Sequence, residues 1–149
     1  MLTDDMLKLI GEHRAGMVAT VNDDGSPSVS PKATFVILDE RTIAFSNLRS
    51  PGTISNIAER PNTEVCFIDV LARKAVRVTG TARYLKNSDM SDALKAAFAE
   101  TWSDYQDKFA GVVQIDISGT KLILSPAYDM GLTESELRTA SLAHLQSLS

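Results

Sequence analysis

The sequence is poor in the residues that build most metal centres and covalent catalytic sites. It has 1 cysteine and 2 histidines among 149 residues. A lone thiol can form neither an internal disulfide nor a cysteine metal cluster, and Cys66 lies in the apolar run VCFIDV, which is typical of a small buried residue. The histidines, His13 and His144, lie near opposite ends of the chain. We therefore expect no metal site, no serine-histidine triad and no hydrolase.

Positive charge and long apolar runs are also scarce. The 15 Lys and Arg against 19 Asp and Glu give a formal net charge of -4. This balance disfavours nucleic acid as a partner, because binding phosphates without sequence specificity needs a basic surface. No run approaches the ~20 apolar residues of a membrane span. The opening MLTDDMLKLIGEH carries acids where a signal peptide carries bases.

Two nucleotide-binding motifs are missing as well, the glycine fingerprint for dinucleotides and the phosphate loop ending in glycine-lysine-serine. What the sequence does have is the composition of an ordinary globular protein, 44% hydrophobic and 23% charged residues. Its length is that of one domain. We therefore expect a single cytoplasmic domain over residues 1–149, with no membrane partner.

Period-two alternation of apolar and polar residues dominates the chain and predicts strands. The expected strands cover residues 17–22, 28–38, 42–47, 63–70, 75–85 and the two halves of 111–125. Asp24-Gly25 and Ser118-Gly119 are the predicted hairpin turns. Gly80, in the middle of an alternating run, indicates a bulge, a bend or a close approach by another group.

Helical spacing and capping residues predict four helices. The first follows Thr3, the second lies near Thr53–Glu59 and is stopped by Pro61, and the third covers residues 88–102 with Ser88 as its N-cap. Thr133 and Glu136 fit a capping box at the start of a terminal helix. Six or seven antiparallel strands with these helices predict a mainly β fold, a barrel or an α+β sheet with flanking helices.

The most specific local signal is the loop SNLRSPGTISNI, residues 46–57. The free amides and the dipole of a helix that begins near Thr53 favour an anion. Ser50 and Thr53 can add hydroxyl donors, Arg49 can add charge, and Gly52 lets a ligand approach the backbone. The alternative is a simple capped helix in which Thr53 bonds its own turn and Arg49 is solvated.

The strand SPSVSPKATF offers a second contribution to such a site. A regular strand places Ser28, Ser30 and Lys32 on one face, and Pro31 indicates an edge strand or a break in pairing beside a ligand. Lys32 could then reach a phosphate or a polarised ring. The alternative is an exposed lysine on an edge strand.

The order of these segments resembles the flavin mononucleotide (FMN)-binding split-barrel family, the pyridoxamine 5′-phosphate oxidase-like proteins. The resemblance rests on ATVNDDGSPSVSP, LDERTIAFSN, SPGTISNIAERPNTEV and VRVTGTARYL, in this order, and covers the chain from about Met6 to Leu85. It implies a six-stranded split barrel that forms a homodimer with FMN at the subunit interface.

The resemblance also implies the cofactor-binding residues. The phosphate would be held by the loop, the start of the second helix and Lys32, and the flavin ring would lie along the second strand. The implied set comprises Ser30, Pro31, Lys32, Ala33, Ser46, Arg49, Ser50, Gly52, Thr53 and Asn56. Trp102 and Tyr105 are candidates to stack on the ring from the partner chain, with packing within their own chain as the alternative.

The sequence departs from true pyridoxamine phosphate oxidases at two places, which disfavours that reaction. Gly52-Thr53 stands where those enzymes have a basic pair, and the carboxyl terminus LTESELRTASLAHLQSLS is not arginine-rich. The first interpretation is an FMN-dependent oxidoreductase that takes electrons from a nicotinamide or a protein donor. The alternatives are a flavin-binding electron-transfer protein with no substrate of its own, and a relative that binds deazaflavin or haem, with His144 as a possible haem ligand.

Overall fold

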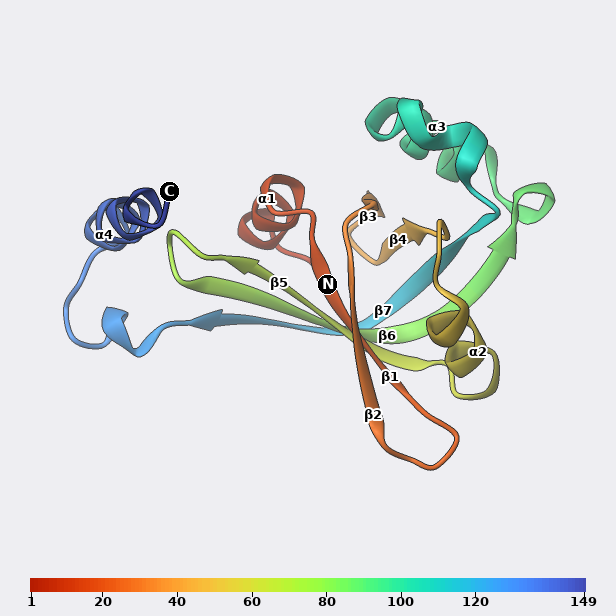
Figure 1. The fold of residues 1–149 in the computed structure, drawn as a ribbon, viewed down its shortest axis with the longest axis horizontal. Helices are drawn as coiled ribbons and strands as arrows, with labels where there is room; N and C mark the ends of the chain where they lie inside the picture. Colours follow the sequence, from red (N-terminus) through yellow and green to blue (C-terminus); the bar gives the residue numbers. More distant parts are fainter.

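The fold is a seven-stranded antiparallel sheet with flanking helices (Figure 1). The computed structural model describes the backbone of residues 1–149 and all side chains except those of residues 106 and 107. The sheet order is β2-β1-β5-β6-β7-β4-β3. Its strands are β1 (Gly16–Val21), β2 (Pro27–Lys32), β3 (Phe35–Asp39), β4 (Thr42–Ser46), β5 (Asn62–Asp69), β6 (Lys74–Lys86) and β7 (Gly111–Leu124). This confirms the mainly β prediction and its strand number.

The sheet must curl, because its two edge strands are consecutive in the chain. Only residues 33 and 34 join β2 at one edge to β3 at the other. A connection this short spans on the order of 10 Å, so the two edges lie close together. The prediction of a single strand over residues 28–38 is therefore wrong. Alternation continues through Ala33, but the pairing partner changes from β1 to β4.

The long strands β6 and β7 pair along their whole length and form the middle of the sheet. The predicted hairpin at Ser118-Gly119 is absent, since β7 runs unbroken through it. The register shifts there instead, with Gly80 opposite Ile117 and Thr79 opposite Gly119, so that Ser118 is the extra residue of a β-bulge. This confirms Gly80 as the site of a bulge and a close approach, because a Cβ at Gly80 would lie 2.5 Å from the carbonyl oxygen of Asp116.

Four α-helices flank the sheet: α1 (Asp4–Glu12), α2 (Pro51–Glu59), α3 (Asp92–Thr101) and α4 (Glu134–Ser147). Short 3-10 turns cover Asn87–Asp89, Ser103–Lys108 and Pro126–Tyr128. The hydroxyls of Thr3 and Thr133 accept hydrogen bonds from the first turns of α1 and α4, as predicted. Ser88 is not the N-cap of α3. It lies in a 3-10 turn, and Ser91 caps the helix through its bond to the amide of Leu94.

The core has two parts. The larger part fills the barrel beneath α1, where Phe35 packs edge-on against Phe67 with ring centroids 4.8 Å apart. The smaller part lies between α3 and the β3–β4 hairpin, and Phe98 packs against Phe109 there. None of the helices that the structure describes is long and apolar enough to cross a membrane. Outside residues 106 and 107, no cluster of His, Cys, Asp and Glu could hold a metal ion.

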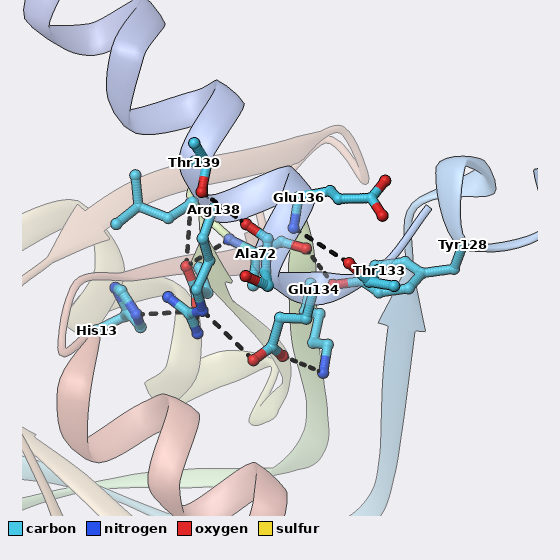
Figure 2. A network of polar contacts seen from close by, with 12 residues as sticks. His13, Ala72, Tyr128, Thr133, Glu134, Glu136, Arg138 and Thr139 are labelled. Carbon is cyan, nitrogen blue, oxygen red and sulfur yellow. Dashed lines mark hydrogen bonds and ion pairs between the residues drawn. The ribbon is translucent and has the colours of Figure 1, made fainter. Parts of the chain in front are cut away.

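A polar network fastens α4 to the end of the sheet that lies farthest from α2 (Figures 1 and 2). The buried carboxylate of Asp69, at the end of β5, accepts a hydrogen bond from Arg138 at 2.7 Å and lies 3.3 Å from Nε2 of His13. Glu134 contacts Lys74 at 2.6 Å. The amides of Leu71 and Ala72 also donate to Asp69. The sequence patterns gave no indication of this network, because its members come from α1, β5, β6 and α4.

Candidate functional site

A hydrogen bond joins the two segments that were predicted to bind phosphate, strand β2 and the loop before α2. Lys32 ends β2, and its Nζ donates to Oγ of Ser50 at 2.7 Å. Ser28, Ser30 and Lys32 are all half-buried and share one face of the edge strand, as predicted. Lys32 thus reaches the residue that precedes α2 across 18 positions of the chain.

The ammonium group of Lys32 is partly removed from water without a matching carboxylate. Burial lowers the pKa of Lys32 below its ordinary value. No ion pair to Lys32 is present among the side chains that the structure describes, and its one hydrogen bond goes to a neutral hydroxyl. A desolvated cation in this state is stabilised by an incoming anion.

The first turn of α2 lies beside the Lys32–Ser50 hydrogen bond and has backbone N–H groups without a partner inside the helix. The helix was predicted to begin near Thr53, but it begins two residues earlier, at Pro51. Proline suits this first helical position because its φ is fixed near the helical value. Ser50 occupies the N-cap position but its side chain makes no capping bond. Proline has no N–H, so the amides of Gly52 and Thr53 are the ones available to an anion. A Cβ at Gly52 would meet nothing within 4 Å, so this chain's own packing leaves the space beside it open.

The loop beside this point borders a hollow of about 390 Å³. Its lining residues are Asn47, Leu48, Arg49, Ser50, Pro51, Ile54 and Tyr84. Arg49 is exposed there. Tyr84 was not among the predicted site residues, although it occupies an inward position of the alternating run in β6. Its hydroxyl donates to the carbonyl of Ala110, which fixes the ring in place.

Besides Ser50, three of the predicted site residues are buried near this point, and two of these fasten the surrounding elements together. The side-chain Nδ2 of Asn56 donates to Oγ1 of Thr20 at 3.0 Å and to Oδ1 of Asn22 at 2.9 Å, and these two bonds hold α2 against β1. Ser46 donates to Oγ1 of Thr34 and so fixes the link between β2 and β3. Thr53 is buried without a side-chain hydrogen bond in the described part of the chain. Of the three, Thr53 keeps its hydroxyl free for a ligand.

The residues predicted to lie along the flavin ring do not all share a face. Ser30 lies on the inner face with Lys32, whereas Pro31 is exposed on the outer face, opposite Met17. Ala33 is exposed just after the strand. The structure therefore brings Lys32 to the start of α2, where Arg49, Ser50, Gly52 and Thr53 lie. Ser30 precedes Lys32 by two residues on the same face of β2.

Trp102, Tyr105 and His144 are the remaining candidates. Trp102 is held within its own chain, because its Nε1 donates to the carbonyl of Phe35 at 3.1 Å and its ring joins the smaller part of the core. Tyr105 is exposed beside it, with ring centroids 6.2 Å apart. His144 lies on α4, at the opposite end of the molecule from α2 (Figure 1).

Comparison with known proteins gives a family match over most of the chain. Residues 2–123 match the family model described as pyridoxamine 5′-phosphate oxidase. The match covers every strand except the end of β7 and stops before α4. No curated protein sequence matches the chain.

Solved structures share the fold. HupZ of Group A Streptococcus is 25% identical, with a TM-score of 0.71 over 84% of this chain and 96% of that one. A Lactobacillus delbrueckii protein assigned as a pyridoxamine 5′-phosphate oxidase is 27% identical, with a TM-score of 0.66 over 80% and 93% of the two chains. An FMN-binding protein from Syntrophomonas wolfei is 14% identical, with a TM-score of 0.64 over 80% and 84%, which is a likeness of fold alone.

Proposed function

The chain belongs to the pyridoxamine 5′-phosphate oxidase family, and from this premise we propose that it binds FMN and acts as an FMN-dependent oxidoreductase. The observation that carries the proposal is the desolvated Lys32, bonded to a hydroxyl at the uncapped start of α2. A phosphate dianion supplies what each of these groups lacks.

The residues at this point fit a phosphate ester. Lys32, Ser50 and Thr53 would hold its oxygens with their side chains, and Gly52 and Thr53 with their amides. Arg49 adds charge at the rim. One helix end contributes roughly 0.3–2 kcal/mol to an anion, and a hydrogen bond to a charged group about 1.5–3 kcal/mol. Together these terms supply a large part of the ~8 kcal/mol that a micromolar ligand requires.

Bound FMN would supply hydride or single-electron transfer, and the protein's part is to bind and surround it. The adjacent hollow is lined by Arg49, Tyr84 and uncharged residues, with no carboxylate or imidazole. This lining favours a second candidate function, electron transfer without a dedicated acid-base group. Rapid bleaching of the bound flavin by a nicotinamide cofactor would support the oxidoreductase, whereas bleaching by a reduced protein donor alone would support the electron carrier.

Replacing Lys32 with Met tests the phosphate site. We expect the Kd for FMN to rise about 10- to 100-fold, because a charged hydrogen bond is lost. The unliganded variant should unfold at the same temperature as wild type or higher, since a partly buried cation is removed. Titration of the apoprotein by flavin fluorescence and a thermal melt give the two values.

The matched control is Lys86→Met, at the exposed end of β6, which should change neither value. Unchanged FMN affinity in the Lys32 variant would place the phosphate elsewhere. A wild-type apoprotein that ignores FMN in the same titration would remove the proposed function altogether.

We further propose that two copies pair through the outer face of the sheet. Register puts Met17, Val29, Cys66, Ile68 and Ile123 on this face. Val29 is 64% exposed and Ile68 47% exposed. Exposed apolar side chains that share one sheet face mark an interaction surface.

An Ile68→Asp variant tests this pairing. We expect wild type to sediment at twice the 16.2 kDa of one chain and the variant at that single mass, because a carboxylate cannot be buried unpaired in an apolar interface. Leu148→Asp, near the end of α4 and 69% exposed, is the control and should leave the dimer intact. A monomeric wild type at micromolar concentration would contradict the pairing.

A further inference from the structure

A second hollow lies between α4 and the turn that joins β5 to β6. These elements lie at the opposite end of the molecule from α2 (Figure 1). The hollow has a volume of about 250 Å³ and is lined by Val70, Arg73, Ser141, His144 and Leu145. Two of these residues come from the turn between β5 and β6, and three come from α4. The helix lies beyond the residues that match the family model.

Two acidic side chains at this end, Asp69 and Glu134, are matched by cations that lie outside the hollow. Asp69 is occupied by Arg138, His13 and two backbone amides, and Glu134 by Lys74 and Arg138 (Figure 2). This network sets the position of the first turns of α4 against the β5–β6 turn. The network therefore fixes the two elements that form the hollow, and the lining of the hollow contains no carboxylate.

Arg73 and His144 carry the uncommitted donors of the hollow. Within the described part of the chain, neither the guanidinium of Arg73 nor the imidazole of His144 makes a hydrogen bond or an ion pair. Arg73 also has a φ of 54°, the left-handed region that favours glycine. An arginine at such a position costs backbone energy that a glycine would avoid, which is consistent with a use for its side chain.

Ser141 adds a hydroxyl to the lining of the hollow. The residue is 9% exposed, lines the hollow, and its hydroxyl has no hydrogen-bond partner among the described residues. None of the described side-chain polar atoms is buried without a hydrogen-bond partner, so this hydroxyl faces the open hollow, where it can bond to a ligand. A polar atom of a ligand in the hollow would replace the water that this hydroxyl otherwise meets.

The walls beside these donors are apolar. Val70 is exposed on the turn and Leu145 on the helix, with 58% and 44% exposure. We propose that the hollow binds a small organic carboxylate, with its charged end between Arg73 and His144, bonded to Ser141, and its apolar body against Val70 and Leu145. An apolar cavity of roughly 150 Å³ already holds benzene, so the volume suits a benzoate-sized molecule. This proposal does not depend on FMN.

Titration of the full-length protein with benzoate, followed by amide NMR shifts, tests the proposal. We expect saturable shifts at residues 70–73 and 141–145 with a millimolar Kd. Benzyl alcohol and inorganic phosphate should bind at least ten-fold more weakly, because the first lacks the charge and the second lacks the apolar body.

Arg73→Gly keeps the left-handed backbone and removes the guanidinium, so it should fold normally and weaken benzoate binding at least ten-fold. Ser141→Ala should weaken it several-fold without lowering the melting temperature. The control Arg83→Gln, at the other end of β6, should bind as wild type does. Shifts near Lys32 only, equal binding of phosphate, or unchanged affinity in Arg73→Gly would each overturn the proposal.

Discussion

Replacing Asp69 with Asn is expected to lower the free energy of unfolding by about 3 kcal/mol, because the change removes the buried carboxylate that Arg138, His13 and two backbone amides contact. The Asp69 carboxylate is 4% exposed and contacts Arg138 and His13, which are themselves only partly buried. Urea unfolding followed by far-UV circular dichroism gives the value. Glu134→Gln, which breaks more exposed contacts of the same network, should cost less than about 1 kcal/mol.

The same variant changes how stability depends on pH. Burial raises the pKa of Asp69, but the amide of Ala72, His13 and Arg138 together lower it further, so its net pKa lies below the ordinary value. A depressed folded-state pKa means that this contribution is complete above the unfolded pKa of about 3.9 and is lost as the pH falls below it. Wild type should therefore lose more stability than Asp69→Asn between pH 5 and pH 3. Parallel losses would contradict this assignment.

Adding a single methyl group at Gly80 is the second change with a large expected effect. In Gly80→Ala the new Cβ would lie 2.5 Å from the carbonyl oxygen of Asp116 and 2.7 Å from Cγ2 of Ile115. The first of these atoms is backbone of the paired strand β7, so relief requires the two strands to separate at the bulge. We expect a loss of about 3 kcal/mol, the upper part of the range for overpacking, measured by urea unfolding.

A second glycine at the same bulge, Gly119, provides the control. A Cβ at Gly119, in the facing strand, would meet only Cβ of Thr79 at 3.9 Å, an ordinary contact. Gly119→Ala should be neutral or should stabilise the protein by about 0.4–1 kcal/mol, through the reduced entropy of the unfolded chain. An equal loss in both variants would mean that the glycines matter for flexibility and not for space.

Period-two patterning located the strands because the barrel has one buried face, and alternation reports directly on that face. The pattern did not predict the positions at which the chain changes from one paired strand to another. Nothing in the composition of residues 28–38 indicates that Lys32 is paired with β1 whereas Phe35 is paired with β4. Ser118-Gly119 was read as a hairpin, but a serine-glycine pair also suits a bulge, and only the length of the facing strand β6 distinguishes the two.

The same distinction applies to the candidate site, where local patterns predicted some of the residues and tertiary packing determines the others. Lys32, Ser50, Gly52 and Thr53 were predictable, because a helix start and an edge strand each have local signatures. Tyr84 and the engaged amide of Asn56 were not, because their roles depend on which elements pack beside them. The Asp69 network and the hollow at Arg73 also depend on tertiary contacts between segments about 70 residues apart.

The link of two residues between β2 and β3 has a consequence for self-assembly into fibres. An open sheet exposes two rows of unpaired backbone groups, each a template on which further chains can stack. Here the two rows are drawn toward one another, and Pro31 removes a donor from one of them. The fold thus protects its sheet from edge-to-edge aggregation through connectivity, and a chain cut between Ala33 and Thr34 would lose that protection.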